Sequence, residues 1–142
     1  MIVLDTNVVS ELSKPTPNAT VIAWVDAQVE LAIAATALAE LRFGVARLPA
    51  GRRKTALSAA IDQFVADDLD DLVLAFDAAC AGAYGLIVAG RERAGRPIAI
   101  ADAQIAATCM VHEAVLATRN LGDFQGAGIE LLDPWDPPNG GR

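Results

Sequence analysis

Three carboxylic acids in this chain follow or open elements that would bring them to one place. Asp5 follows the apolar run "MIVL", which is typical of a short strand buried on both faces, and Asp123 comes after a later apolar run, "AVLAT". Asp102 lies near the start of a predicted helix. Because ligands bind beyond the carboxyl ends of parallel strands, we expect these acids to share one crevice.

Each of these acids also has a plain structural alternative. Asp5 and Asp102 are good N-cap residues for the helices that follow them, and Asp123 lies in a segment that suits a simple turn. A fourth aspartate, Asp77, is interpreted as a helix cap. The functional interpretation therefore depends on the acids converging and not on any one of them.

Glu40 is a further candidate. It lies at the border of the apolar stripe of a predicted helix over residues 36–48, which Thr36 is expected to cap. A glycine inside a helix costs about 1 kcal/mol relative to alanine, so Gly44, together with Ala37, is interpreted as leaving room for a pocket beside Glu40. The alternative is an ordinary glutamate that faces solvent.

Carboxylates crowded into one crevice repel one another and hold their protons tightly unless a cation neutralises them. A set of oxygen ligands favours Mg²⁺ or Mn²⁺ over zinc, and the single histidine, His112, cannot build a zinc site. Such a cluster is suited to phosphodiester hydrolysis, in which metal lowers the pKa of water and stabilises charge on the leaving oxygen. Whether one or two metal ions act stays open.

The elements that would position these acids alternate between strands and helices, which predicts an α/β fold with parallel strands and helices on both faces. The apolar patterns place strands at 1–4, 30–34, 71–76, 114–118 and, at an edge, 129–133; they place helices at 7–14, 18–28, 36–48, 50–68, 77–94 and from about 102 onward. Residues 119–128 are expected to form a loop.

The composition describes an ordered chain without a membrane span. Of 142 residues, 54% are hydrophobic, which suits one well-covered α/β domain. The longest apolar stretch, between Asp77 and Arg91, is shorter than the ~20 residues that cross a bilayer. No export signal is recognised at the N-terminus, so we expect a cytoplasmic protein with no membrane partner. Cys80 and Cys109 are interpreted as small core residues.

The net charge of −7 argues against nucleic-acid binding through bulk charge but leaves room for local basic patches. Two basic clusters either contact RNA phosphates or simply face solvent: Arg47, Arg52, Arg53 and Lys54 in one, and Arg91, Arg93 and Arg96 in the other. An acidic run, Asp67, Asp68, Asp70 and Asp71, is interpreted as a solvated helix end and turn.

Three segments, in this order and at this spacing, resemble the PIN domain of toxins of the VapC and FitB type. They are "VLDTNVVSEL", "AELRFGVARLPAGRRKTAL" and "GRPIAIADAQIAATCMVHEAVLATRNLGDF". The resemblance implies a PIN-like three-layer α/β/α sandwich with a central parallel sheet of four to five strands. It implies a PIN domain over residues 1–135 and an irregular C-terminal tail over residues 136–142.

The resemblance also implies a function. It points to a Mg²⁺-dependent endoribonuclease, with Mn²⁺ as a substitute metal, that is the toxin of a type II toxin–antitoxin pair. The matching catalytic positions are Asp5, Glu40, Asp102 and Asp123, of which Asp5 and Asp102 are expected to bind the metal directly. The polar positions expected to support them are Asn7, Thr118 and Asn120, and Arg119 is expected to bind RNA.

The partners implied by the resemblance are an RNA substrate, a second copy of the chain in a homodimer, and a VapB-like antitoxin. An extended or helical antitoxin segment would lie along a groove and block the acidic site, and its Arg or Lys would pair with the carboxylates.

Three rival functions start from the same acidic pocket. An aspartyl-nucleophile phosphatase requires a second Asp where this chain has Asn7, and it requires a lysine late in the chain, where none follows Lys54. A phospho-acceptor receiver domain lacks the same late lysine. The alternative that stays open is a PIN-fold nucleic-acid-binding or regulatory module without turnover.

Overall fold

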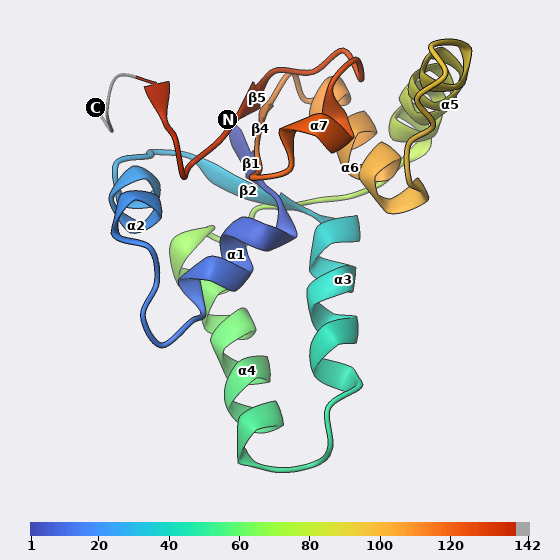
Figure 1. The fold of residues 1–142 in the computed structure, drawn as a ribbon. Helices are drawn as coiled ribbons and strands as arrows, with labels where there is room; N and C mark the ends of the chain where they lie inside the picture. The colour runs from blue at the N-terminus through green and yellow to red at the C-terminus, as the bar shows by residue number, and fades with distance from the viewer. Residues whose placement is uncertain (139–142) are drawn as a thin grey trace.

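The computed structural model describes residues 1–138 and contains a parallel sheet whose five strands lie in the order β3, β2, β1, β4, β5 (Figure 1). The strands are Ile2–Leu4 (β1), Leu31–Ala34 (β2), Val73–Leu74 (β3), Val115–Ala117 (β4) and Leu131–Leu132 (β5). The strand order reverses between β1 and β4. In open α/β sheets this reversal opens a crevice at the carboxyl ends of the two strands, and ligands bind there.

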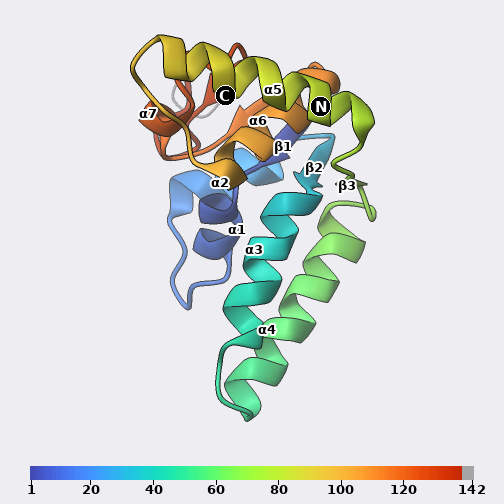
Figure 2. The same cartoon turned by 90° about the vertical axis from the view of Figure 1, so that its right-hand side faces the viewer.

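Helices cover both faces of the sheet, which confirms the predicted three-layer α/β/α arrangement. The helices are Thr6–Leu12 (α1), Ala19–Asp26 (α2), Ala35–Ala46 (α3), Arg52–Gln63 (α4), Ala78–Arg93 (α5), Ile100–Val111 (α6) and Leu121–Phe124 (α7). In Figures 1 and 2, α1 to α4 lie on one side of the sheet and α5 and α6 on the other. The pair α3 and α4 forms a hairpin that projects away from the sheet.

The core lies between the sheet and the two helical layers. Val3, Leu4, Ile33 and Leu116 have no exposed surface, because central strands covered on both faces bury their side chains, and Ile105 of α6 is buried against them. Cys80 and Cys109 are also fully buried, as predicted for small core residues. Burial raises the pKa of the Cys109 thiol to about 12, so this thiol stays protonated.

Asn18 and Asp77 are the N-cap residues of α2 and α5, whereas the N-cap predicted for α3 is wrong. Asn18 caps α2 by accepting from Thr20 N at 2.9 Å, and Asp77 caps α5 by accepting from Cys80 N at 3.1 Å. The predicted cap at Thr36 is wrong, because β2 runs directly into α3 and the helix already begins at Ala35. Thr36 therefore lies inside the first turn.

The Thr36 hydroxyl forms a link between layers instead of a cap. Its Oγ1 donates to Gln104 Oε1 of α6 at 3.1 Å. Glu40 lies one helical turn beyond Thr36 on α3, and Asp102 lies two residues before Gln104 on α6. The hydrogen bond therefore fixes α3 and α6 near the two acids that the sequence singled out.

Other boundaries differ because short elements depend on tertiary contacts. The expected loop over 119–128 contains α7, which buries Phe124, and the expected strand over 71–76 shrinks to Val73–Leu74. The expected helix over 50–68 ends as α4 at Gln63 and continues as one π-helical turn, Phe64–Asp68. The four aspartates of the acidic run are exposed, as predicted.

The last described residues pack against the domain. Pro134 is fully buried and Trp135 packs against the core cluster. The domain boundary at residue 135 stays a prediction, and residues 139–142 of the expected tail lie outside the described residues. Within residues 1–138, no helix is both long enough and apolar enough to cross a membrane.

Thr36→Val is expected to lower the free energy of unfolding by about 1 kcal/mol, because it removes one hydrogen bond between layers and leaves Gln104 Oε1 without its donor. Urea denaturation measures this change. Thr55→Val is the matched control, because its hydroxyl bonds only to Gly51 O at the exposed start of α4, and it should cost less. Equal costs for the two variants would contradict a linking role for Thr36.

Candidate active site

Asp5 and Thr118 stand side by side because β1 and β4 are paired in register. Leu4 pairs with Ala117, and Asp5 N donates to Ala117 O at 2.9 Å, so the first residue after each strand lies at the same level. Thr118 Oγ1 donates to Asp5 Oδ2 at 2.8 Å. The two side chains thus meet where the strand order reverses.

Asn7 completes this hydrogen-bond network. Its Nδ2 donates to Asp5 Oδ2 and to Thr118 Oγ1, both at 3.2 Å, and its Oδ1 accepts from Arg119 N at 3.2 Å. The Thr118 hydroxyl also accepts from Asn120 N at 3.0 Å, which uses its one donor and both of its acceptor sites. A saturated network leaves the Asp5 carboxylate little freedom to rotate.

Asp5 is a helix cap and a candidate ligand at the same time. Its Oδ1 accepts from Thr6 N at 2.8 Å at the start of α1, while its Oδ2 faces Thr118 and Asn7. The residue is only 4% exposed. A buried charged group of this kind is tolerated because both oxygens are hydrogen-bonded and because the helix N-terminus favours negative charge.

Asp102 and Glu40 approach Asp5 from α6 and α3. Asp102 is half-buried in the first turn of α6, two residues past the helix start, so it is not the N-cap. Burial, together with the charges of Asp5 and Asp123, raises the pKa of the Asp102 carboxyl. Burial and the charges of Asp5 and Asp102 likewise raise the pKa of Glu40. The charges of these carboxylates therefore affect one another's pKa values.

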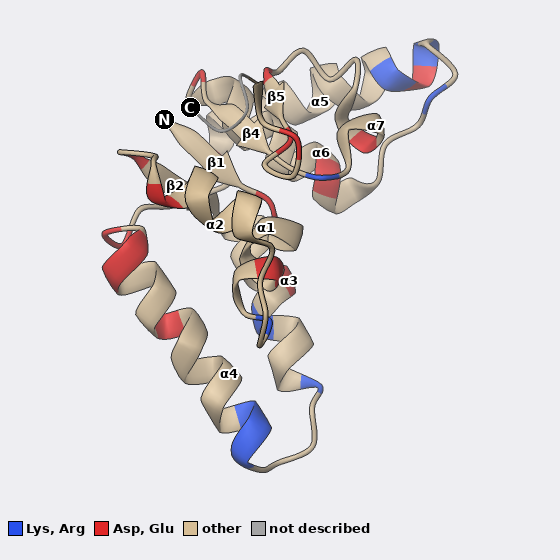
Figure 3. Ribbon diagram, turned by 60° about the vertical axis from the view of Figure 1, so that its left-hand side comes forward, with Lys and Arg blue, Asp and Glu red and all other residues tan. Residues whose placement is uncertain are grey.

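Asp123 reaches the same cluster from α7. It is exposed, lies in the first turn of this four-residue helix, and acts on Asp102 through its charge. Figure 3 shows acidic positions on α3, α6 and α7 along the carboxyl edge of the sheet. The four acids named from the sequence therefore lie near one another. Asp5 is buried, Asp102 is half-buried, and Glu40 and Asp123 are exposed.

The cations named from the sequence have different surroundings. Arg119 is exposed next to the site, and its guanidinium lies over the Trp135 ring, 5.0 Å from the ring centroid. The cluster around Arg52 lies at the far tip of the α3 and α4 hairpin (Figure 3). Arg93, in the last turn of α5, and Arg96, in the turn that follows, are exposed, and Arg96 Nη2 donates to Gly122 O of α7 at 3.4 Å.

Arg91 is the residue that sequence reasoning misplaced. Grouped with a surface cluster, it is instead 5% exposed, and its guanidinium bonds to backbone carbonyls next to Asp123. A signal was present, because Cys80, Ala83, Ile87 and Arg91 repeat at helical spacing and form the buried face of α5. Extending the apolar stripe by one turn would have placed Arg91 in the core.

The four acids fit a divalent metal ion by the chemistry of their donors. Within residues 1–138, no three His, Cys, Asp or Glu side chains converge on one point as they stand. The set is all oxygen, it includes one rigid carboxylate, and the exposed Glu40 and Asp123 have room to rotate toward an ion. A cation would also relieve the repulsion that raises the pKa of Asp102 and Glu40.

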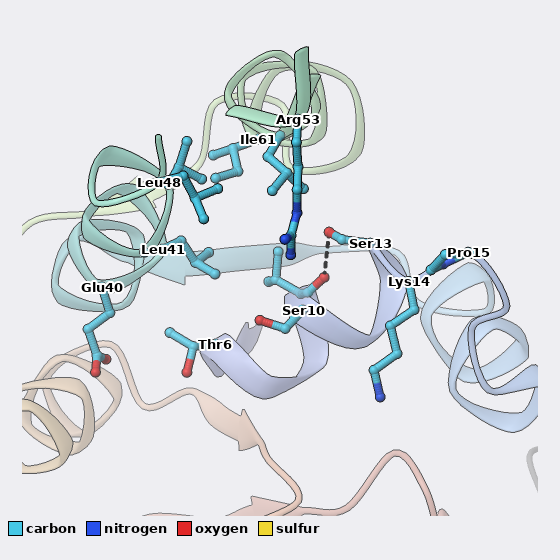
Figure 4. Close-up of a pocket in the computed structure, with 14 residues that line it drawn as sticks. Thr6, Ser10, Ser13, Lys14, Pro15, Glu40, Leu41, Leu48, Arg53 and Ile61 are labelled. Atoms are coloured by element: carbon cyan, nitrogen blue, oxygen red, sulfur yellow. Dashed lines mark hydrogen bonds between the residues drawn. The ribbon is translucent and has the colours of Figure 1, made fainter. Parts of the chain in front are cut away.

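A groove opens from the acids along the helical hairpin (Figure 4). It has a volume of about 530 Å³ and runs between α1, α3 and α4. Glu40 and Thr6 lie at one end, and Leu41, Leu48 and Ile61 line the apolar wall. Gly44 also lines the groove, and a Cβ added there would meet no atom within 4 Å. The small residue predicted to leave room beside Glu40 does so.

Comparisons with known proteins agree with this geometry. Residues 2–127 match the family described as "PIN domain". The chain is 42% identical over 139 residues to "VapC ribonuclease Y4jK" of Sinorhizobium fredii, covering 96% of this chain and 99% of that protein. It is 39% identical over 137 residues to "Toxin FitB" of Neisseria gonorrhoeae, covering 95% of this chain and 99% of that protein.

A solved structure has the same fold. "Structure of FitAB bound to IR36 DNA fragment" contains a chain that superposes with a TM-score of 0.89 at 38% sequence identity, covering 96% of each chain. The similarity therefore extends over nearly the whole molecule.

Asp102→Asn is expected to stabilise the protein in EDTA at pH 7, raising the midpoint of thermal unfolding by about 2 °C, because it removes repulsion among half-exposed carboxylates. Differential scanning calorimetry measures the shift. Asp136→Asn, at an exposed aspartate outside the cluster, should leave the midpoint unchanged.

The pH dependence of the wild-type protein has a definite sign. Because the folded state holds the Asp102 and Glu40 protons more tightly than the unfolded state, stability in EDTA should rise as pH falls through their raised folded pKa values. This gain in stability ends near the ordinary pKa range of carboxyl groups. In that range Glu11, whose pKa is lowered by its hydrogen bond with Lys14, begins to lose its stabilising contribution. A midpoint that falls steadily from pH 7 downward would contradict the repulsion.

Proposed function

This chain belongs to the PIN domain family, and we propose that it is a Mg²⁺-dependent endoribonuclease, the toxin of a type II toxin–antitoxin pair. The names of its relatives support ribonuclease activity and a toxin role. The observation that carries the proposal is the carboxylate of Asp5, fixed by Thr118 and Asn7 at the carboxyl edge of β1 and β4 and coupled through charge to Asp102 and Glu40. These acids can bind a divalent metal ion, which in turn can act on a phosphodiester.

The proposed roles divide according to burial. Asp5 and Asp102 hold the principal Mg²⁺, and Glu40 and Asp123 complete its surroundings or hold a second ion. Bound there, Mg²⁺ or Mn²⁺ would supply an acidified water and neutralise charge on the phosphate. Asn7 and Thr118 keep the Asp5 oxygens in place. Asn120 supports them through its backbone N–H, which donates to Thr118 Oγ1.

Two residues of this chain act on the substrate in this proposal. Glu40 presents an exposed carboxylate beside Asp5 and Asp102, so its carboxylate can accept a proton from the attacking water. Arg119 presents its guanidinium to an RNA phosphate while Trp135 supports the planar face of that guanidinium. Water attacks the phosphorus directly, the P–O bond to the leaving ribose oxygen breaks, and that oxygen takes up a proton from solvent, so no covalent intermediate with the enzyme is required.

Asp5→Asn tests this function, because asparagine also caps helices well and so removes charge while keeping the cap. Wild type incubated with labelled total RNA and Mg²⁺ or Mn²⁺ should yield discrete fragments, and EDTA should abolish them. Asp5→Asn should lose at least about 100-fold in cleavage rate. Asp26→Asn, at an exposed aspartate in the last turn of α2, should retain full cleavage.

The same assay separates the alternative function. If Asp5→Asn cleaves as fast as wild type, the acidic cluster is not the active site. If wild type binds Mn²⁺ but cleaves no RNA in the pool, the PIN-fold module without turnover becomes the better explanation. Sequencing of the new RNA ends would identify the target.

The proposed antitoxin binds along the groove of Figure 4. Leu41, Leu48 and Ile61 form its apolar wall, and Arg53 adds positive charge to its rim. An extended or helical segment with an apolar face and acidic flanks matches this lining. A basic residue at the end of that segment would reach Glu40 and pair with the carboxylates. The homodimer stays a prediction of the family resemblance.

Gly44→Phe tests the groove without removing any contact, because the new side chain enters open space. Co-expressed with its cognate antitoxin, this variant should bind the antitoxin at least about 10-fold more weakly and should still cleave RNA. Gly44→Ala is the matched control and should retain binding while gaining about 1 kcal/mol of stability. Wild-type antitoxin affinity in Gly44→Phe would exclude this groove.

A further inference from the structure

Arg91 is a buried cation that forms no ion pair within residues 1–138, although its charge acts on Asp102 and lowers the pKa of that carboxyl. It lies in the last turn of α5 and is 5% exposed, yet the ion pairs found within residues 1–138 join Lys14 to Glu11 and Arg42 to Asp62. Burying an unpaired guanidinium is costly unless its donors are all used. A buried Arg91 therefore requires specific hydrogen-bond acceptors around its guanidinium.

Its donors reach two separate segments of the chain. Arg91 Nε donates to Arg96 O at 2.6 Å, in the turn that leads from α5 to α6. Its Nη1 donates to Asp123 O and to Gln125 O, both at 2.9 Å, at the end of α7. The Arg91 guanidinium therefore links the turn before α6, which carries Asp102, to α7, which carries Asp123.

The helix α7 depends on an outside partner of this kind. It has four residues, and a helix of that length is unstable alone because it has too few internal hydrogen bonds. Its last carbonyl groups also lack partners within the helix. The chain turns sharply at Gly126, with φ of +82°, and passes close over the Arg91 side chain, so Arg91 acts as the C-terminal cap of α7.

We propose that Arg91 is a positioning residue for the metal site. By holding α7 against the turn before α6, it fixes the position of Asp123 relative to Asp102, the two acids proposed to act on the metal from these helices. This inference rests on the proposed function, because it assumes that the four acids hold a metal. The Arg91 guanidinium donates its hydrogen bonds to the backbone that carries the acids, and its charge also acts on Asp102.

Charge and position predict opposite effects when Arg91 is replaced. A positive charge near the acids opposes cation binding, so Arg91→Met would tighten binding if charge were all that mattered. Loss of the tether lets α7 and Asp123 move away, so Arg91→Met should weaken binding. The sign of the change therefore identifies the role.

The experiment measures Mn²⁺ affinity from the EPR signal of free Mn²⁺ during titration of the full-length protein. Arg91→Met should bind Mn²⁺ at least about 10-fold more weakly than wild type, the size of effect seen when groups that orient metal ligands are removed. Arg93→Met is the matched control, because it removes the same charge from an exposed position on the same helix. Its affinity should equal that of wild type.

Arg91→Lys provides a second variant if Arg91→Met does not fold. It keeps the charge but lacks the planar fork that reaches both segments, so it should also bind Mn²⁺ more weakly. Circular dichroism in EDTA establishes that each titrated variant is folded. Wild-type or tighter Mn²⁺ binding in a folded Arg91→Met or Arg91→Lys protein would overturn the positioning role.

A separate variant distinguishes this failure from failure of the proposed function. If Asp5→Asn binds Mn²⁺ as tightly as wild type, the acids do not hold the metal and the proposed function fails with the inference. If Asp5→Asn loses Mn²⁺ but both Arg91 variants retain it, only the role of Arg91 is wrong.

Discussion

The hydrogen bond from Thr118 Oγ1 to Asp5 Oδ2 joins the ends of two strands that are 113 residues apart in sequence. It forms only if β1 and β4 pair in the observed register, with Leu4 opposite Ala117. A shift of one residue would turn Thr118 away from Asp5 and leave a buried carboxylate without its donor. The site and the centre of the sheet therefore form together, and neither is independent of the other.

The other acids lower the stability of the folded protein. Asp102 and Glu40 are forced near Asp5, and the resulting repulsion, with burial, raises their pKa values. A protein selected for stability alone would replace one of them with a neutral residue. The structure limits this strain by making only Asp5 fully buried and by leaving Glu40 and Asp123 exposed to water, which screens their charges.

Sequence reasoning located what local chemistry determines. Apolar runs followed by polar residues identified the ends of β1 and β4, and Asp5 and Asp123 were named because carboxylates after such strands share an edge. Asp102 was named from the start of its helix and Glu40 from the border of an apolar stripe, and the family resemblance joined the four into one set. Sequence reasoning failed where long-range contacts decide. The short helix α7 is held by the buried side chain of Phe124 and by Arg91 and Arg96, which donate to its carbonyl oxygens. Thr36 links to α6 because β2 leads into α3 without a loop.

Net charge links the chemistry to the partners. The chain carries a formal charge of −7, and several of its cations are already engaged: Lys14 pairs with Glu11, Arg42 pairs with Asp62, and Arg91 is buried. A phosphate that approaches the four acids is therefore repelled until a cation neutralises them. In the proposed function, a divalent metal ion and a basic antitoxin side chain compete for the same negative charges. The metal ion admits RNA to the site, and the antitoxin side chain excludes it, because each neutralises the acids but only one leaves room for a phosphate.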